Sequence, residues 1–226
     1  VPHEKMEDMA VVYRIILDQT DSCNGTILIT NQMLDQYGIT KEQLRADTLG
    51  NAPEIRPSEI RGMSEVMSEL APGMLPEVAP EDEQMFVASV PDKIHGAGVI
   101  AYPNFMEDAA EKMGGDFFVL PSSIHEVLLV KDNGQMTAKE LENMVKEVNA
   151  TQVEPADQLT DHVYHYDSQN HIFELADKYE ERQREAEHEA VDKDSVLGDL
   201  KEKKQEIAKK DPAKDAATKA ATKKHE

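Results

Sequence analysis

The sequence GDFFVLPSSIHEVLLVK at residues 115–131 contains two apolar runs separated by a break. Phe117 to Leu120 are all apolar, which is typical of a strand that is buried on both faces. Pro121 lacks a backbone N–H and is followed by two serines, so we expect it to end this strand. Residues 124–131 are again mostly aliphatic and predict a second strand.

Three further pairs of segments predict strands joined by turns. The pairs are 9–18 with 26–30, 85–90 with 97–102, and 162–166 with 171–175. The first connection contains Asn24-Gly25, a dipeptide that suits the positive φ angles of a tight hairpin. The second contains Pro91, Asp92 and Gly96, which are turn residues.

Helices are predicted between these strands, over 31–37, from Thr40, from Ser58 to about Leu70, over 104–113 and over 138–149. Gly38 and Gly114-Gly115 follow two of these segments, as expected for left-handed helix ends. Thr40 with Gln43, and Thr137 with Glu140, have the spacing of a capping box.

Prolines interrupt the chain between the predicted elements. Pro53 and Pro57 are expected to separate the second helix from the third. Residues 71–84 contain three prolines and four acids, and we predict a loop that leaves and rejoins one domain. The fold class expected is therefore α+β, with a mixed or antiparallel sheet of hairpins and helices packed on it.

The composition changes near residue 175. We predict an acidic α+β domain over 1–175, a solvated charged helix over 176–210, and a disordered tail rich in Lys and Ala over 211–226. The net charge of −21 comes from 45 acids and 24 Lys and Arg residues. Of these, residues 174–226 hold 15 acids and 13 bases, so nearly all the excess belongs to the preceding part.

An acidic body repels phosphate, so its surface disfavours direct contact with nucleic acids and anionic membranes and favours cationic partners or divalent cations. The alternative is that the charge serves solubility alone. Residues 201–224 differ, because they hold nine Lys against four acids. This segment predicts either a solubilising tail that folds back on the body or a nucleic-acid-binding tail. The 11 methionines predict an adaptable core, with a Met-lined binding surface as the alternative.

Location and redox chemistry follow from what the sequence contains. No apolar stretch approaches the length of a membrane span, and the chain does not open with a signal peptide, so we expect a cytoplasmic protein. Cys23 is the single cysteine, which excludes an intramolecular disulfide and a thiolate metal cluster. We expect no cofactor.

Two groups of residues are candidates for a site. His95, Ser122, Ser123 and His125 are the catalytic candidates, although the chain has no Gly-x-Ser-x-Gly nucleophile motif and sequence proximity does not build a triad. His165, Asp167 and His171 are the candidate metal ligands, since His171 could approach the other two across the predicted hairpin. The alternative is that the histidines of this hairpin are simply exposed.

Four separated segments occur together in the order expected of one family. They are DMAVVY at 8–13, NAPEI at 51–55, GDFFVLPSSIHEV at 115–127 and VNATQV at 148–153. They resemble a bacterial domain-of-unknown-function family, numbered fifty-six eighty-eight, which is common in gut anaerobes. The resemblance covers roughly residues 1–175. Family members typically have a further N-terminal region, so it implies that this chain is a fragment or a shortened member.

The resemblance implies a fold and a lineage but no activity and no catalytic residues. Its most distinctive stretch, 120–126, is expected either to re-aim the chain with its serines capping backbone groups or to line a groove that His125 faces. We therefore predict a non-catalytic cytoplasmic interaction or regulatory protein that binds another protein through its acidic body or helical tail. The alternatives are an enzyme or metal-dependent site around His95, Ser122, Ser123 and His125, and nucleic-acid association through 201–224.

Overall fold

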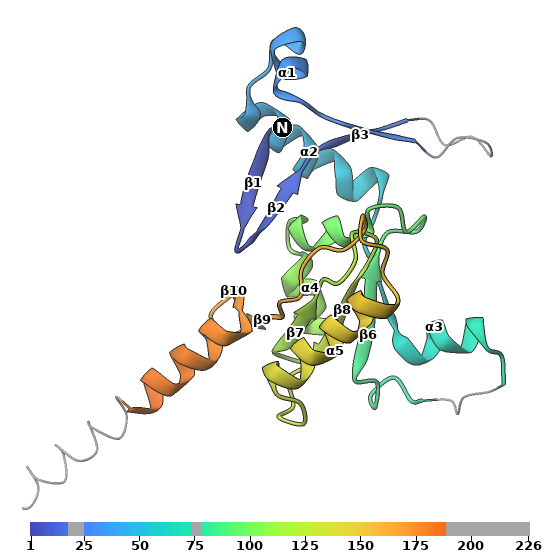
Figure 1. Ribbon diagram of the computed structural model, residues 1–226, viewed down its shortest axis with the longest axis vertical. Coiled ribbons are helices and arrows are strands. Elements are labelled where there is room, and N and C mark those ends of the chain that lie inside the picture. The colour runs from blue at the N-terminus through green and yellow to red at the C-terminus, as the bar shows by residue number, and fades with distance from the viewer. Residues whose placement is uncertain (18–24, 74–77, 189–226) are drawn as a thin grey trace, which may run out of the picture. The chain divides into compact units, whose positions relative to one another are not determined.

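The computed structural model describes residues 1–17, 25–73 and 78–188 (Figure 1). The chain divides into two compact units, Val1–Tyr179 and Glu180–Glu226. In the second unit the described residues, 180–188, are helical. Cys23, the predicted tail at 211–226, the Lys-rich segment 201–224 and the rest of the predicted charged helix lie outside the described residues.

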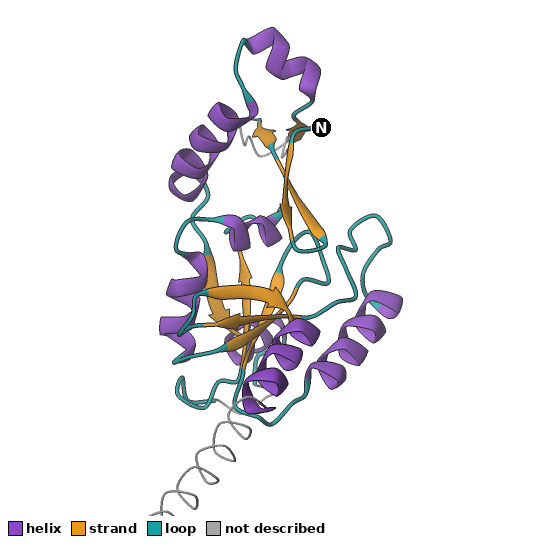
Figure 2. Cartoon of the chain, turned by 90° about the vertical axis from the view of Figure 1, so that its left-hand side faces the viewer, coloured by secondary structure: helices purple, strands orange, loops and turns teal. Residues whose placement is uncertain are grey.

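The described part of the first unit builds a six-stranded sheet in the order β10-β9-β7-β8-β6-β5, with every neighbouring pair antiparallel (Figure 2). The strands are β5 Glu59–Gly62, β6 Met85–Ser89, β7 Phe117–Leu120, β8 Val127–Lys131, β9 Tyr164–Asp167 and β10 Ile172–Leu175. Helices accompany this sheet, so the predicted α+β class with an antiparallel sheet is confirmed.

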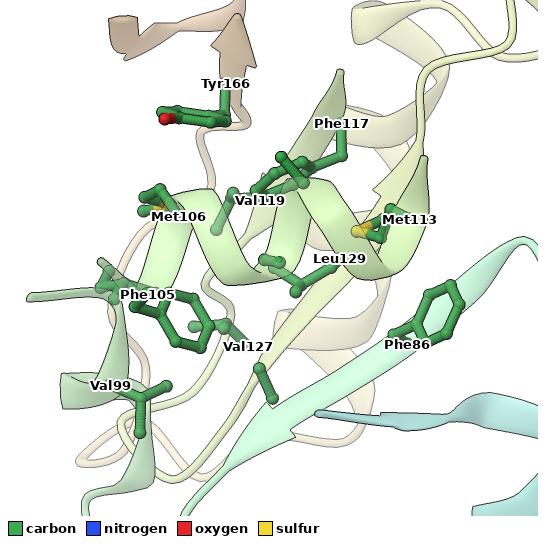
Figure 3. Close-up of a cluster of buried hydrophobic side chains, with 14 of the residues drawn as sticks. Phe86, Val99, Phe105, Met106, Met113, Phe117, Val119, Val127, Leu129 and Tyr166 are labelled. Atoms are coloured by element: carbon green, nitrogen blue, oxygen red, sulfur yellow. The ribbon is translucent and has the colours of Figure 1, made fainter. Parts of the chain in front are cut away.

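The stretch 115–131 supplies the two middle strands, β7 and β8, with Val119 opposite Leu129. Alternate residues of β7 enter different cores, because successive side chains of a strand point to opposite faces. Phe117 and Val119 pack on the side of α4 (Phe105–Met113), where Figure 3 shows Phe105, Met106 and Met113 beside them. Phe118 and Leu120 pack on the side of α5 (Ala138–Thr151). Burial on both faces explains why the run is apolar throughout.

A smaller layer of elements precedes the sheet in the sequence. It contains the antiparallel pairs β1 His3–Met6 with β2 Met9–Val12 and β3 Arg14–Ile16 with β4 Thr26–Leu28. The helices α1 Asn31–Tyr37 and α2 Lys41–Ile55 follow. Tyr13, Ile29, Leu34 and Leu44 form a separate small core among these elements.

The predicted first hairpin is correct for only part of its length. The runs 9–18 and 26–30 predict one hairpin, but β2 pairs back with β1 and only β3 pairs with β4. The run divides at Tyr13, which is buried in the small core. Because this side chain is buried, the run forms two strands, β2 and β3, although the apolar pattern predicts one continuous strand.

Two other predictions are wrong. Residues 97–102 are not a strand, because the 3₁₀ helix η1 covers Gly96–Ala101. Both edges of β6 are already paired, with β5 and β8, so no place beside β6 remains for another strand. The helix predicted from Ser58 starts later: β5 comes first, and α3 covers Met63–Leu70.

The helix boundaries show which local signals decide structure. Gly38 and Gly114 end α1 and α4 with φ of 66° and 84°, as their positions predict. Thr137 and Glu140 form a complete capping box at α5. Pro53 does not separate helices as expected, because α2 continues through it to Ile55.

Residues 176–188 form a helix directly after β10. Within the first unit, Ala176 is buried, and the Tyr179 ring stacks on His165 with the ring centroids 3.5 Å apart. The start of this helix therefore belongs to the packed body. No helix within the described ranges is both long enough and apolar enough to cross a bilayer.

Candidate functional site

Two adjoining hollows of about 310 and 230 Å³ lie where the β1–β2 hairpin, β3 and η1 meet; α2 lines the larger one. We call them the first hollow and the second hollow, and together the cleft. The two share the lining residues Met6, Val11, Val12, Arg14, His95, Gly98 and Ala101. Because so many residues line both, the hollows form one continuous site.

The first hollow is basic in a chain that is strongly acidic. Its charged lining consists of Lys5, Arg14, Arg45 and Arg56 against a single acid, Glu4. In the whole chain acids outnumber Lys and Arg by 45 to 24. Glu4 is also paired with Lys41, at 3.2 Å between carboxylate and ammonium. The first hollow therefore has a local charge opposite to that of the chain.

The three arginines of this hollow are held differently. Arg56 pairs with Asp92 and donates a hydrogen bond of 2.6 Å to the Ile94 carbonyl, so part of its guanidinium is committed. Arg14 donates from Nε to Thr26 Oγ1 at 2.7 Å, and no described residue accepts a hydrogen bond from its terminal N–H groups. The Arg45 side chain has no hydrogen-bond or ion-pair partner among the described residues. Arg14 and Arg45 can therefore donate to a bound anion.

Two tyrosines add neutral polar groups to the first hollow. Burial, followed by the charge of Glu4, raises the pKa of Tyr13. Burial also raises the pKa of Tyr102. Both phenols keep their protons at neutral pH; the Tyr13 hydroxyl is hydrogen-bonded to Glu4, whereas the Tyr102 hydroxyl can donate to a ligand.

The second hollow is apolar. Aliphatic side chains of the hairpin, η1 and two loops form it, and Arg14 and His95 are its only polar side chains among the described residues. The aliphatic set includes Met6, Met9, Ile100, Ile124 and Leu159. The presence of Met6 and Met9 agrees with the Met-lined binding surface that the composition offered as an alternative.

His95 lines both hollows, and its backbone has a positive φ of 53° at the start of η1. Burial lowers the pKa of His95, and the nearby positive charges of Arg14 and Arg56, together with His125, lower it further. The ring is therefore neutral at pH 7, with one nitrogen donating and the other accepting. His95 presents a neutral polar group beside two arginines.

The structure brings His95 and His125 together. Their rings are stacked with centroids 5.8 Å apart. His125 Nδ1 lies 3.2 Å from the Lys93 carbonyl oxygen, and its Nε2 lies 3.5 Å from an Asp157 carboxylate oxygen. Of this pair, His95 alone lines the cleft.

The two candidate serines do not join the histidine pair through their hydroxyls. Ser123 Oγ accepts a hydrogen bond from the His125 backbone N–H at 3.1 Å, which is a local turn interaction. Within the part of the chain that the structure describes, neither imidazole is hydrogen-bonded to a serine hydroxyl. Ser123 also forms a β-bridge with Gln158, and Ile124 N–H donates to the Asp157 carbonyl. Because residues 123 and 124 make these contacts, β8 begins at Val127 and not at residue 124, where the sequence predicts it.

The structure does not gather the candidate metal ligands at one point. His165 is fully buried, and its Nε2 lies 3.0 Å from Asp132, whose pKa this hydrogen bond lowers. Asp167 accepts from the backbone of Gln169 and Asn170 and so holds the turn after β9. His171 lies 3.1 Å from the Tyr166 hydroxyl.

Within the described ranges, no group of three or more His, Cys, Asp and Glu side chains is arranged to hold a metal ion. The expectation that the histidines of this hairpin are simply exposed is wrong for His165. It packs edge-on against Phe118 and stacks on Tyr179.

Sequence reasoning missed the arginines of the cleft. A signal was present, because four of the six arginines of the chain, at positions 14, 45, 56 and 61, lie in its first 61 residues. Their distribution shows a basic N-terminal part, but it does not show that three of them face one hollow. The arginines face one hollow only because β3, α2 and η1 are packed beside one another in the tertiary structure.

Comparison with known proteins identifies the lineage. The sequence profile of a family of unknown function, DUF5688, matches residues 1–168. No curated protein and no solved structure matches the chain. The match covers most of the chain and confirms the resemblance found in the four separated segments. The chain therefore belongs to the family of unknown function DUF5688.

Proposed function

We propose that this chain is a non-catalytic, cytoplasmic regulatory domain whose cleft binds a small carboxylate or phosphate anion. The observation that carries the proposal is the lining of the first hollow, where four basic side chains stand against one acid. In a partly enclosed site, such charges are screened less than on an open surface. Arginine also offers paired N–H donors in the geometry of a carboxylate or phosphate.

The strong negative charge of the chain makes this cluster selective. An anion that approaches the acidic surface is repelled, so only a site with several nearby cations retains it. Arg14 and Arg45 have N–H groups that no other described residue engages. Arg56 is held in place by Asp92, whose carboxylate offsets its charge, so Arg14 and Arg45 supply the positive charge available to a ligand.

The arrangement favours binding over catalysis. A nucleophilic mechanism needs a hydroxyl within hydrogen-bond reach of a base, and the Ser123 hydroxyl is instead engaged with the backbone of His125. His125 does have a carboxylate neighbour, Asp157, but it does not line the cleft. His95 does line the cleft and is neutral at pH 7, so it supplies a hydrogen bond rather than a charge.

Isothermal titration calorimetry with a panel of phosphate, succinate, hexanoate and octanoate tests the proposal. We expect at least one of these to bind with a stoichiometry of one, and to bind more weakly as salt is added. Arg45→Ala should weaken binding about tenfold or more. Arg184→Ala, which removes an exposed arginine outside the cleft, is the matched control and should have no effect. Binding of no anion, or equal binding by the Arg45 variant, contradicts the proposal.

A protein partner is the second candidate function, and one observation favours it. An open hollow between β3 and α2 is lined by Ile16, Leu17 and Ile55, which are 37, 41 and 67% exposed. Contiguous exposed aliphatic side chains often mark interaction surfaces. If a partner binds there, Ile55→Glu should abolish its capture from a lysate, whereas Leu70→Glu, at an exposed aliphatic residue outside this hollow, should preserve it.

A further inference from the structure

We propose that the ligand of the cleft is amphipathic: an alkyl anion whose charged head lies at the arginines and whose chain of about six to eight carbons fills the second hollow. This inference rests on the proposed function and adds the chemical class of the ligand. It follows from the unequal chemistry of the two hollows. The charged residues of the first hollow are concentrated at one end of the cleft, and the lining becomes aliphatic towards the other.

The position of Arg14 fixes the orientation of such a ligand. Arg14 lines both hollows, whereas Arg45 and Arg56 line only the first. A head bound by Arg14 and Arg45 therefore lies at the junction or within the first hollow. The part of the ligand that extends into the second hollow meets no other charged side chain among the described residues. A polar group placed there would lose its bound water without gaining a hydrogen bond, which costs free energy, whereas an apolar group would not.

The lining of the second hollow is suited to an alkyl chain. Met6 and Met9 are flexible and polarisable, so they adapt to chains of different shape. Val12 and Leu159 are 40 and 38% exposed, although both line this hollow. An alkyl chain that covers them removes apolar surface from water. Each added methylene is expected to tighten binding about fourfold.

The volume of the second hollow limits the length of the chain. It is about 230 Å³. A water molecule occupies roughly 30 Å³ in the liquid, and a methylene group is of similar size, so about six to eight carbons fit. Affinity should therefore rise with chain length and then level off.

The head is an oxyanion, either a carboxylate or a phosphate. Among the described residues, the terminal N–H groups of Arg14 and the side chain of Arg45 have no hydrogen-bond partner, so two guanidinium groups can share the charge. The neutral ring of His95 can donate or accept one further hydrogen bond. This set accepts both head groups, and the experiment below distinguishes them.

The test is calorimetric titration of the full chain with butanoate, hexanoate, octanoate and decanoate at constant ionic strength. We expect the dissociation constant to fall about 16-fold for each two methylenes up to about eight carbons, and little further at decanoate. Octyl phosphate is compared with octanoate to identify the head group. Octanol, which has the chain without the charge, should bind at least tenfold more weakly than the better anion.

Two variants separate the ends of the ligand. Arg14→Gln should weaken butanoate and octanoate by a similar factor, whereas Leu159→Asn should weaken octanoate and leave butanoate nearly unchanged. Leu70→Asn, an exposed leucine outside the cleft, is the matched control.

The outcomes also separate this inference from the proposed function. Equal binding of butanoate and octanoate, or octanol binding as tightly as the anions, overturns the amphipathic ligand; in the first case the anion site itself stands. Binding of no anion at any length overturns both.

Discussion

The imidazole rings of His95 and His125 are stacked at 5.8 Å between centroids, although 30 positions separate the residues in the chain. The loop before η1 turns sharply here, since Lys93 and His95 have φ of 59° and 53°. Ser89 reinforces the contact by donating from its hydroxyl to the His125 carbonyl at 2.8 Å. The stacking therefore fixes the loop that carries His95 into the cleft.

Close packing at Gly96 gives the first prediction. A Cβ at this position would collide with Ser89 Oγ and the His125 carbonyl oxygen. We expect Gly96→Ala to lower the free energy of unfolding by about 1–3 kcal/mol, as overpacking does. Urea denaturation measures this change. Gly98→Ala is the matched control, because apart from its chain neighbours and its own helix backbone no described atom lies within 4 Å of a Cβ there. Equal stability of the two variants would show that the contact is not a tight one.

The pH dependence of stability should report on His95. Burial and the charges of Arg14, His125 and Arg56 lower the pKa of His95 below its value in the unfolded chain. The unfolded state therefore binds the proton first, and stability is lost as pH falls through the ordinary histidine range. Above that range the contribution is complete.

Denaturation at pH 8, 7, 6 and 5 checks this second prediction. The decline with falling pH should be shallower in His95→Asn than in the wild type, and asparagine also tolerates the positive φ. His188→Asn, at an exposed histidine of the second unit, should decline like the wild type. Parallel curves for the wild type and the His95 variant would rule the explanation out.

Asp8 is predicted to hold the β1–β2 hairpin on the sheet. It accepts from the Tyr164 hydroxyl and lies 2.7 Å from His162 Nδ1. Burial opposes the charge of Asp8, but these hydrogen bonds prevail and lower its pKa. Asp8→Asn should lower the free energy needed to detach the hairpin from the sheet by about 1–3 kcal/mol.

Hydrogen exchange resolves this effect, because it reports local opening. Backbone amides of β1 and β2 should exchange faster in Asp8→Asn, while those of β7 remain protected. Asp177→Asn, at an exposed aspartate, is the control. Uniform acceleration over both regions would mean that Asp8 stabilises the whole unit rather than the hairpin.

The variant should also weaken anion binding, since the hairpin lines both hollows.

The core on the α5 side gives the fourth prediction. Leu141 is completely buried there, beside Phe118 and Leu120 of β7. Leu141→Ala should cost about 2–5 kcal/mol, because it removes apolar contacts and leaves a cavity. Glu147→Ala, on the exposed side of α5, should change stability by less than about 0.5 kcal/mol. Urea denaturation compares the two, and a small effect at Leu141 would contradict a packed core on this face.

Local signals were sufficient for several elements. The apolar run at Phe117–Leu120 predicted β7, and the capping box of Thr137 and Glu140 predicted the start of α5. Gly38 and Gly114 predicted two helix ends. Each of these depends on residues within a few positions of one another, so the information is present in the sequence itself.

Long-range pairing was not predictable in the same way. Residues 97–102 have the composition of a strand, but both edges of β6 are occupied and the segment becomes η1. Likewise, nothing local indicates that the run 9–18 divides at Tyr13. These outcomes depend on which other strands are available for pairing. The hydrophobic periodicity of a segment, two residues for a strand or 3.6 for a helix, carries no information about its partners.

By itself, the sequence determined the α+β class, the family, the positions of β7, α4 and α5, and the acidic character of the chain. Only the tertiary structure decided that His95 meets His125, that the candidate metal ligands point to different partners, and that Arg14, Arg45 and Arg56 face one hollow. The physical reason is range. Strand and helix patterns arise from neighbouring side chains, whereas a binding site arises where segments far apart in the chain are packed together.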